Sequence, residues 1–196
     1  MQFGDVPIVT KELKTKDEIQ KYTARQPKSE VYNLIISDLT QVINSELPDI
    51  QTGNGVGRAS KAAAYALLGK VYLTMAADSD FQSERTSNLQ SAKTNLVAAW
   101  NMKPFTSLKD IPYADVFDKE AQTFCQENIF QVMYKGGNSS LASNYAYIFQ
   151  PTSQTGLTSQ KTGTGNNIPT SDMMSAYESG DTRKAISCGR HRTLIM

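Results

Sequence analysis

The segment from Gly57 to Leu73 constrains the fold more than any other part of the chain. It reads GRASKAAAYALLGKVYL, in which a glycine and a serine precede an almost uninterrupted run of residues with high helix propensity. We therefore predict a helix from about Arg58 to Ala77. Small residues recur on this helix at spacings of three and four: Ala59, Ala62, Ala63, Ala66 and Gly69. One side of the helix is thus nearly bare, and a second helix is expected to approach it closely. Larger residues are expected to fill the rest of its buried surface: Leu67, Leu68, Val71, Tyr72 and Met75.

Two helices are predicted before this segment. Thr15 and Glu18 have the spacing of a capping box, which predicts a short helix that ends at about Ala24. A longer amphipathic helix is predicted from Ser29 until Pro48 stops it. A loop that contains residues 51–55 should then join it to the helix of the Gly57 segment, against which it should pack antiparallel.

The segment from Asp78 to Arg85 is polar and is predicted to be a loop. Ser87 and Gln90 again have capping-box spacing, and a further helix is predicted from there to about Pro104. Four large apolar residues lie on this helix, and its tryptophan is predicted to be a core residue: Leu89, Leu96, Val97 and Trp100.

The second half of the chain has a different character. A helical turn is predicted at residues 113–117, a strand at 128–134, and a long loop region at 135–168, where polar residues dominate without apolar periodicity. Thr170 should cap a last short helix that ends at Gly180. The fold class expected is therefore mainly α, with tetratricopeptide-like helix pairs, a loop-rich half and a few short strands.

The composition disfavours several classes of function. Twenty basic and nineteen acidic residues leave the chain nearly neutral, which argues against a nucleic-acid partner. Two cysteines and one histidine do not have the spacing of a metal site, so no metal and no cofactor is expected. The sequence also has no phosphate-binding glycine loop and no arrangement of nucleophile, base and orienting group. No catalytic residue is therefore assigned, although an α-helical hydrolase with an acidic pair remains an alternative.

Five motifs in order resemble the SusD/RagB family of glycan-capturing outer-membrane lipoproteins. The first is the segment GRASKAAAYALLGKVYL itself. The others are FGDVPIVT at residues 3–10, VYNLIISDL at 31–39 followed by Leu47 and Pro48, YADVF at 113–117 with ENIFQV at 127–132, and PTSDMMSAYESGDTR at 169–183. The resemblance spans residues 3–183.

The resemblance implies a partial SusD-like domain over residues 1–183, with a helical scaffold at about 15–103, a loop-rich half at 104–183 and an atypical tail at 184–196. It implies a protein without enzymatic activity that binds a glycan or other nutrient and passes oligosaccharide to a SusC-type TonB-dependent outer-membrane transporter. Family members are lipid-anchored at the cell surface. Because the lipoprotein signal and the lipidated cysteine are not in this sequence, we expect the chain to be an internal fragment.

The candidate ligand-binding residues lie in the loop-rich half. Sugars are bound by aromatic faces together with amide or hydroxyl groups, and an extended segment would place alternate rings on one face. These criteria select Asn144, Tyr145, Tyr147 and Phe149. The same rings would also serve to pin the loop onto the helical half. A tetratricopeptide-like scaffold that binds a protein partner without any sugar is the alternative function.

The remaining motif residues are expected to be structural. Arg58 lies beside Gly57 at the predicted helix start, where a cation is unfavourable next to the helix dipole, so a carboxylate or carbonyl partner is expected for it. Gly180 should form a tight turn that holds Asp181 and Arg183 in a local ion pair. Together with Ala62, Ala63, Leu67 and Leu68, these residues make up the structural motif set.

Overall fold

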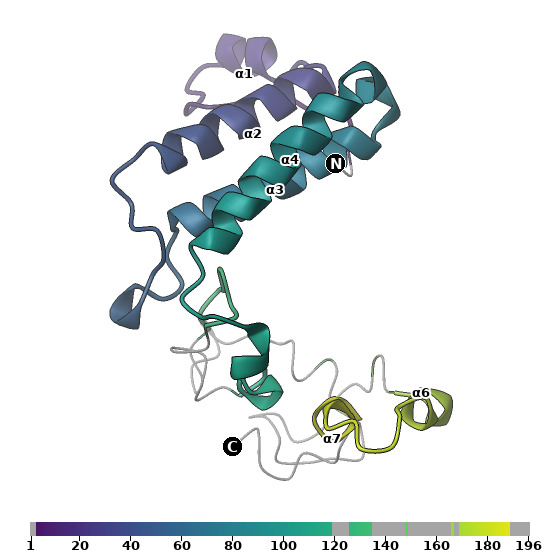
Figure 1. The fold of residues 1–196 in the computed structure, drawn as a ribbon. Coiled ribbons are helices and arrows are strands. Elements are labelled where there is room, and N and C mark those ends of the chain that lie inside the picture. Colours follow the sequence, from purple (N-terminus) through teal and green to yellow (C-terminus); the bar gives the residue numbers. More distant parts are fainter. Residues whose placement is uncertain (1–2, 119–125, 135–147, 149–165, 167–168, 189–196) are drawn as a thin grey trace. The chain divides into compact units, whose positions relative to one another are not determined.

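The computed structural model is mainly helical and describes residues 3–118, 126–134, 148, 166 and 169–188 (Figure 1). Its contacts divide the chain into two compact units. The first consists of Met1–Gln51 and Arg58–Lys103, and the second of Thr52–Gly57 and Pro104–Met196. The mainly helical fold class is confirmed.

The first unit contains four α-helices: α1 at Lys16–Tyr22, α2 at Lys28–Ile43, α3 at Lys61–Ala77 and α4 at Arg85–Asn101. A 3₁₀-helix, η2, spans Ser79–Glu84 between α3 and α4. Helix α3 packs against both α2 and α4 and therefore lies between them (Figure 1). The start of α2 meets the end of α3 through the ion pair of Lys28 with Asp78, which confirms the antiparallel packing of α2 and α3.

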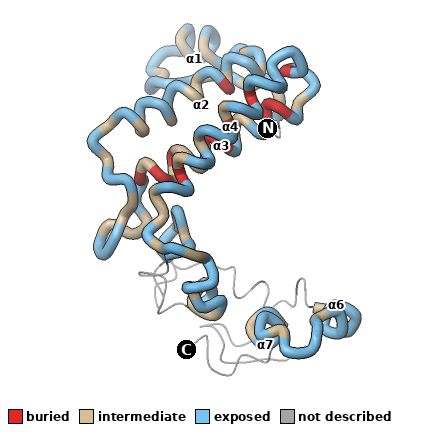
Figure 2. Tube along the Cα trace, viewed as in Figure 1, coloured by how far each residue is buried: buried red, intermediate tan, exposed pale blue. Residues whose placement is uncertain are grey.

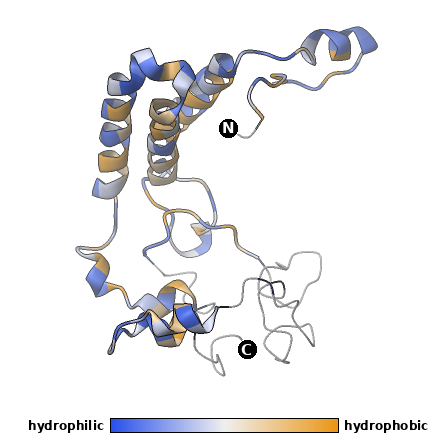
Figure 3. Ribbon diagram, turned by 90° about the vertical axis from the view of Figure 1, so that its right-hand side faces the viewer, coloured by the Kyte–Doolittle hydropathy of each residue, from blue (hydrophilic) through white to orange (hydrophobic). Residues whose placement is uncertain are grey.

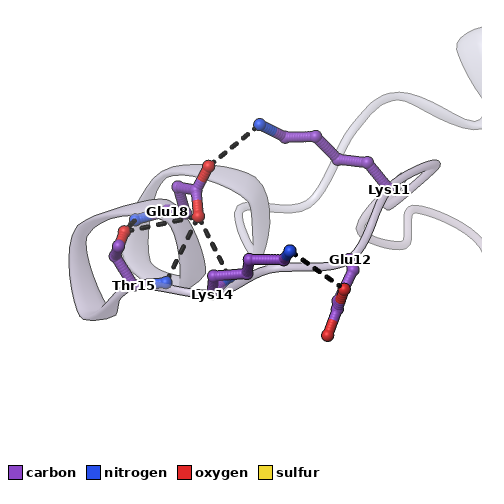
Figure 4. Close-up of polar contacts among 5 residues, drawn as sticks. All are labelled: Lys11, Glu12, Lys14, Thr15 and Glu18. Atoms are coloured by element: carbon purple, nitrogen blue, oxygen red, sulfur yellow. Dashed lines mark hydrogen bonds and ion pairs between the residues drawn. The ribbon is translucent and has the colours of Figure 1, made fainter.

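The predicted capping box opens α1. The Thr15 hydroxyl accepts a hydrogen bond from the Glu18 backbone N–H, and the Glu18 carboxylate accepts one from the backbone N–H of Thr15 (Figure 4). The same carboxylate accepts from the Lys14 backbone N–H and pairs with the Lys11 ammonium at 3.0 Å. These hydrogen bonds lower the pKa of Glu18, the one from the Lys14 backbone most strongly. The helix begins where the sequence predicts because its free N–H groups are satisfied locally.

The segment before α1 is fixed to the start of α2. Val6 and Gln26 form an isolated antiparallel bridge, in which the Gln26 N–H donates to the Val6 carbonyl at 3.0 Å. The Lys28 backbone N–H donates to a carboxylate oxygen of Asp5 at 2.9 Å. The Gly-Asp-Val-Pro motif therefore has a structural role at this point: its aspartate accepts from a first-turn N–H of α2.

Several predicted element boundaries are corrected. Helix α3 starts at Lys61 rather than near Arg58, because Ser60 is its N-cap and accepts from the Ala63 N–H at 3.2 Å. Helix α4 starts at Arg85, and Ser87 does not cap it, since the Ser87 hydroxyl instead donates to the Glu84 carbonyl. Helix α2 ends at Ile43, short of Pro48.

The segment before α4 was predicted to be a loop, and the structure corrects this prediction. The segment forms the helix η2, in which Phe81 is buried and packs edge-on against Tyr32 with ring centroids 5.3 Å apart. Together with Met75 these two rings form the core cluster of the first unit. Figure 2 shows buried residues on the long helices of the first unit. The single aromatic side chain in a polar segment is therefore what anchors η2.

The second unit contains short elements. The 3₁₀-helices are η1 at Gly53–Gly55, η3 at Leu108–Asp110 and η4 at Tyr113–Val116, and the α-helices are α6 at Ser171–Ser175 and α7 at Arg183–Cys188. Helical turns were expected where η4 and α6 lie, and Thr170 caps α6 as predicted, although α6 ends before Tyr177. The strand predicted at 128–134 does not form: these residues have no ladder partner within the described part of the chain.

Candidate functional site

The predicted sugar-binding residues cannot be placed. Asn144, Tyr145, Tyr147 and Phe149 all lie outside the described residues. The features that the structure does place are the family motif on α3, a charged cluster where α2, α3 and η2 meet, the partly exposed apolar residues of α4, and the turn at Gly180.

Gly57 belongs to the second unit and packs closely there. Its φ is +89°, and a Cβ on this residue would come within 2.7 Å of Met133 Cγ and 3.5 Å of the Gln131 carbonyl oxygen. The position thus requires glycine for both its backbone conformation and its space. The adjacent Arg58 is exposed, and no hydrogen bond or ion pair to it is found within the described residues, so the partner expected for it is not among them.

The motif residues of α3 divide between two environments. Ala62 and Leu68 are buried and Ala63 is partly buried, but Leu67 is 49% exposed, contrary to its predicted burial. The close helix approach is confirmed at Gly69, where a Cβ would lie 2.6 Å from Leu96 Cγ on α4. The small-residue face of α3 therefore sets its distance from α4.

A charged cluster holds α2, α3 and η2 together. The Lys28 ammonium donates to both carboxylate oxygens of Asp78, at 2.9 and 2.7 Å, and pairs with Asp80 at 2.6 Å. Asp78 also caps η2 by accepting from the Asp80 backbone N–H. Lys28 lies 5.8 Å from the centroid of the Phe81 ring. One lysine thus links the first turn of α2 to the residues that follow α3.

These contacts perturb the titration of the cluster. The Lys28 hydrogen bond lowers the pKa of Asp78, and the hydrogen bonds to Asp78 and Asp80 raise the pKa of Lys28. Burial raises the pKa of the neighbouring Tyr32, whose hydroxyl is buried without a hydrogen-bond partner in the described structure. Both carboxylates are paired with the same lysine, so the cluster stabilises the fold rather than presenting a group for proton transfer.

Trp100 of α4 is half exposed, contrary to the prediction that it is a core residue, and three other large apolar residues of this helix are also partly exposed. Leu89, Leu96, Val97 and Trp100 are 43%, 37%, 47% and 50% exposed. The residues of α4 that are buried are small or polar: Asn88, Ala92 and Ala99. The Lys103 ammonium lies 4.4 Å from the Trp100 ring centroid. Leu96 nevertheless contacts α3, since its side chain packs against Gly69.

The turn at Gly180 matches its prediction. Gly180 has a φ of +87°, and the Arg183 guanidinium donates to both carboxylate oxygens of Asp181, with the shortest distance 2.6 Å. The Asp181 carboxylate also accepts from the Arg183 backbone N–H. The Arg183 side chain lowers the pKa of Asp181 most strongly. The Gly-Asp-x-Arg motif is thus a local turn that leads into α7, whose first residue is Arg183.

Within the described residues, no group of three or more His, Cys, Asp or Glu side chains is arranged to hold a metal ion. None of the helices described is both long enough and apolar enough to cross a membrane.

Comparison with known proteins supports the family resemblance. Residues 1–73 match the model of a SusD-like family described as starch-binding and associating with the outer membrane. None of the curated proteins matches the chain. The crystal structure of a SusD-like protein from Bacteroides fragilis has a similar fold, with a TM-score of 0.61 and 23% sequence identity over 89% of this chain.

That alignment covers 31% of the Bacteroides fragilis protein, so the present chain spans about a third of the length of the structure it matches. The matched segment contains three of the five motifs: FGDVPIVT, VYNLIISDL and GRASKAAAYALLGKVYL. Residues 1–73 therefore resemble this SusD-like family, and the fold of the chain is similar to that of a SusD-like protein.

Proposed function

We propose that the chain is part of a non-catalytic glycan-binding component of an outer-membrane uptake system. The observation that carries the proposal is the match of residues 1–73 to a family described as starch-binding and associating with the outer membrane. The described side chains agree with it, since the charged groups in the two clusters are paired with one another rather than arranged for proton transfer.

In this proposal the oligosaccharide is passed to a SusC-type TonB-dependent transporter, and the full-length protein is held at the cell surface by a lipid anchor. Both points follow from the family resemblance. The chain itself supplies a rigid helical unit, in which α3 is fixed between α2 and α4. A rigid scaffold is the usual support for binding residues carried on loops.

The proposed sugar contacts are Asn144, Tyr145, Tyr147 and Phe149. Isothermal titration of the purified chain with starch-derived and other oligosaccharides tests them. Saturable binding that is lost in Tyr145→Ala and Tyr147→Ala supports the proposal, with circular dichroism to verify folding. Tyr22→Ala is the matched control, because Tyr22 lies on α1 in the first unit. Absence of binding by the folded chain, or equal loss in the control, contradicts the assignment of the site.

A second function, docking of a protein partner on the helical unit without sugar, is favoured by one observation. Four large apolar residues are exposed along α4, whereas the exposed large apolar residues of the chain include none from α2. One edge of the helical layer is therefore suited to solvent and the other to a partner. A chain that binds no oligosaccharide but retains this surface would serve as a scaffold.

A further inference from the structure

The turn η1 carries the single Asn-Gly dipeptide of the chain, at Asn54 and Gly55. An asparagine that precedes glycine is especially prone to deamidation, because glycine has no Cβ to obstruct its own backbone nitrogen and restricts the backbone least. Asn54 is exposed, and its side-chain amide makes no hydrogen bond with any residue that the structure describes. Both the sequence and the exposure therefore single out this asparagine.

Deamidation at this dipeptide needs only water as a co-reactant. The Gly55 backbone nitrogen attacks Cγ of Asn54, a bond forms between these two atoms, and the bond from Cγ to the side-chain nitrogen breaks. The proton of the Gly55 N–H leaves with that nitrogen as ammonia, and a succinimide ring remains. Water then opens the ring on one of its two sides, which gives aspartate or isoaspartate. In isoaspartate the main chain runs through Cβ and Cγ and is one carbon longer.

The η1 turn opposes this reaction, but only weakly. The Gly55 N–H donates to the Thr52 carbonyl at 2.9 Å, so its nitrogen is engaged until the turn opens. Thr52 is the N-cap of the turn and makes no side-chain cap hydrogen bond. The long helices of the first unit carry hydrophobic residues, whereas η1 consists of two glycines and one asparagine (Figure 3). A short turn without apolar side chains opens far more easily than the whole chain unfolds.

The loop around η1 is closed at its base by residues of the first unit. The Gln51 side-chain amide donates to the Ala59 carbonyl at 2.6 Å, and the Lys61 backbone N–H donates to the Pro48 carbonyl at 3.0 Å. These hydrogen bonds do not involve the segment Thr52–Gly57. A change at Asn54 is therefore confined to that segment, and the start of α3 keeps its contacts.

We propose that Asn54 deamidates spontaneously when η1 opens, and that the isoaspartate product releases the segment Thr52–Gly57 from Met133. The added main-chain carbon lies inside a turn whose hydrogen bonds, 2.9 and 3.2 Å long, each span three residues, so they lose their geometry. Gly57 follows directly after the turn and is in close contact with Met133. A longer main chain before Gly57 displaces it from this contact. The inference does not depend on sugar binding.

Asn44 provides a matched comparison in the same chain. Like Asn54 it is exposed, and the N–H of the next residue, Ser45, donates to the carbonyl three residues earlier, that of Val42, at 3.2 Å. The two sites differ in the residue that follows the asparagine. Serine has a Cβ beside the attacking nitrogen, so deamidation at Asn44 should be slower.

The test follows the full chain during incubation at neutral pH and physiological temperature. Peptide mass spectrometry with fragmentation locates each conversion of asparagine to an acid, and isoaspartyl methyltransferase labels isoaspartate. A synthetic peptide of residues 51–58 gives the rate without the folded turn. Asn54→Gln blocks the reaction, since the longer side chain would have to close a larger ring. Hydrogen exchange in the fresh and the aged chain reports whether the segment is released.

The expected result is faster conversion at Asn54 than at Asn44, with isoaspartate among the products. The folded chain should react about 10- to 100-fold more slowly than the peptide, because the hydrogen bonds of the turn must open first. Met133→Ala should bring the rate closer to that of the peptide, since it removes the side chain that packs on Gly57. Met173→Ala, at an exposed methionine of the second unit, is the control and should leave the rate unchanged.

Hydrogen exchange tests the consequence of the reaction. In the aged chain the amides of Gly55 and Val56 should exchange faster, whereas those at the start of α3 should be unchanged, and aged Asn54→Gln should show neither change.

Several results would overturn the proposal. Absence of isoaspartate at Asn54 after an incubation that converts the peptide would exclude the site. Equal rates in the peptide and the folded chain would show that η1 does not delay the reaction, and faster conversion at Asn44 would remove the role of Gly55. Unchanged exchange at Gly55 in the converted chain would mean that the segment is not released.

Discussion

Replacement of Gly69 by alanine tests the close packing of α3 on α4. The added Cβ would lie 2.6 and 2.7 Å from Cγ and Cδ2 of Leu96 and 3.3 Å from the Ala92 carbonyl oxygen. Overpacking of this kind costs about 1–3 kcal/mol, whereas alanine in place of glycine inside a helix contributes about 1 kcal/mol of stability. We therefore expect Gly69→Ala to lower the free energy of unfolding by about 1 kcal/mol.

The sign of this effect should depend on Leu96. In a Leu96→Ala background the main steric conflict is absent, so Gly69→Ala should become neutral or stabilising by up to about 1 kcal/mol. The interaction energy between the two sites in a double-mutant cycle should be about 1–2 kcal/mol. Urea denaturation followed by Trp100 fluorescence provides the free energies for the unit that contains both helices.

Thr74→Ala is the control for helix propensity at an exposed site of the same helix, where the only side-chain hydrogen bond lost among the described residues is the local one to the Lys70 carbonyl. The reasoning is refuted if Gly69→Ala stabilises the chain as much as Thr74→Ala does, or if the Leu96→Ala background leaves its effect unchanged. Either result would mean that α3 and α4 are farther apart than the structure shows.

Two further predictions concern the ends of α3. Ser60→Ala should lower the free energy of unfolding by about 1 kcal/mol, because the N-cap hydrogen bond from the Ala63 N–H is lost. Ser87→Ala is the control and should have little effect, since Ser87 does not cap α4. Thermal melts followed by circular dichroism compare the two variants. The hydrogen bond from Lys28 lowers the pKa of Asp78, so the stability that this ion pair contributes is present above about pH 4 and is lost as the pH falls through the folded-state pKa. Asp78→Asn should therefore reduce the change in the free energy of unfolding between pH 3 and 6, measured by urea denaturation. An unchanged pH dependence in this variant would contradict the prediction.

The predictions from sequence that the structure confirms in most detail concern local hydrogen bonds. The capping box of Thr15 and Glu18, the cap at Thr170 and the ion pair of Asp181 with Arg183 each involve residues within three positions of one another. Such contacts depend on backbone geometry over one turn, which the residue types largely determine. The capping box predicted at Ser87 does not form, because α4 already begins at Arg85, two residues earlier. A local pattern thus does not show how far a helix extends toward a neighbouring element.

Burial was less predictable than helix formation. Helical spacing groups Leu96 and Trp100 on one face of α4, but it does not reveal which face meets α3. The contact buries Ala92 and Ala99 and also uses Leu96, whose side chain packs against Gly69 although the residue stays partly exposed. The burial of Phe81 was missed because a polar composition outweighed one aromatic residue.

The predicted sugar contacts could be tested least. Tyr145 and its neighbours were selected on chemical type, since an alternating pattern of rings predicts a shared face only in an extended segment. Specific sugar recognition depends on where several loops meet, and that arrangement is set by contacts between residues far apart in the sequence. For this reason the assignment remains a proposal.

The order of the chain through the two units has a consequence for how the protein is made. Residues Thr52–Gly57 belong to the second unit although they are synthesised before α3 and α4. Gly57 packs against Met133, which follows it by more than seventy positions. All residues of the first unit have been synthesised once the chain reaches Lys103, so its helices can associate on the nascent chain. The contact of Gly57 with Met133 can form only later, after Met133 has been synthesised. Co-translational folding should therefore proceed in two stages, the second of which closes a long loop.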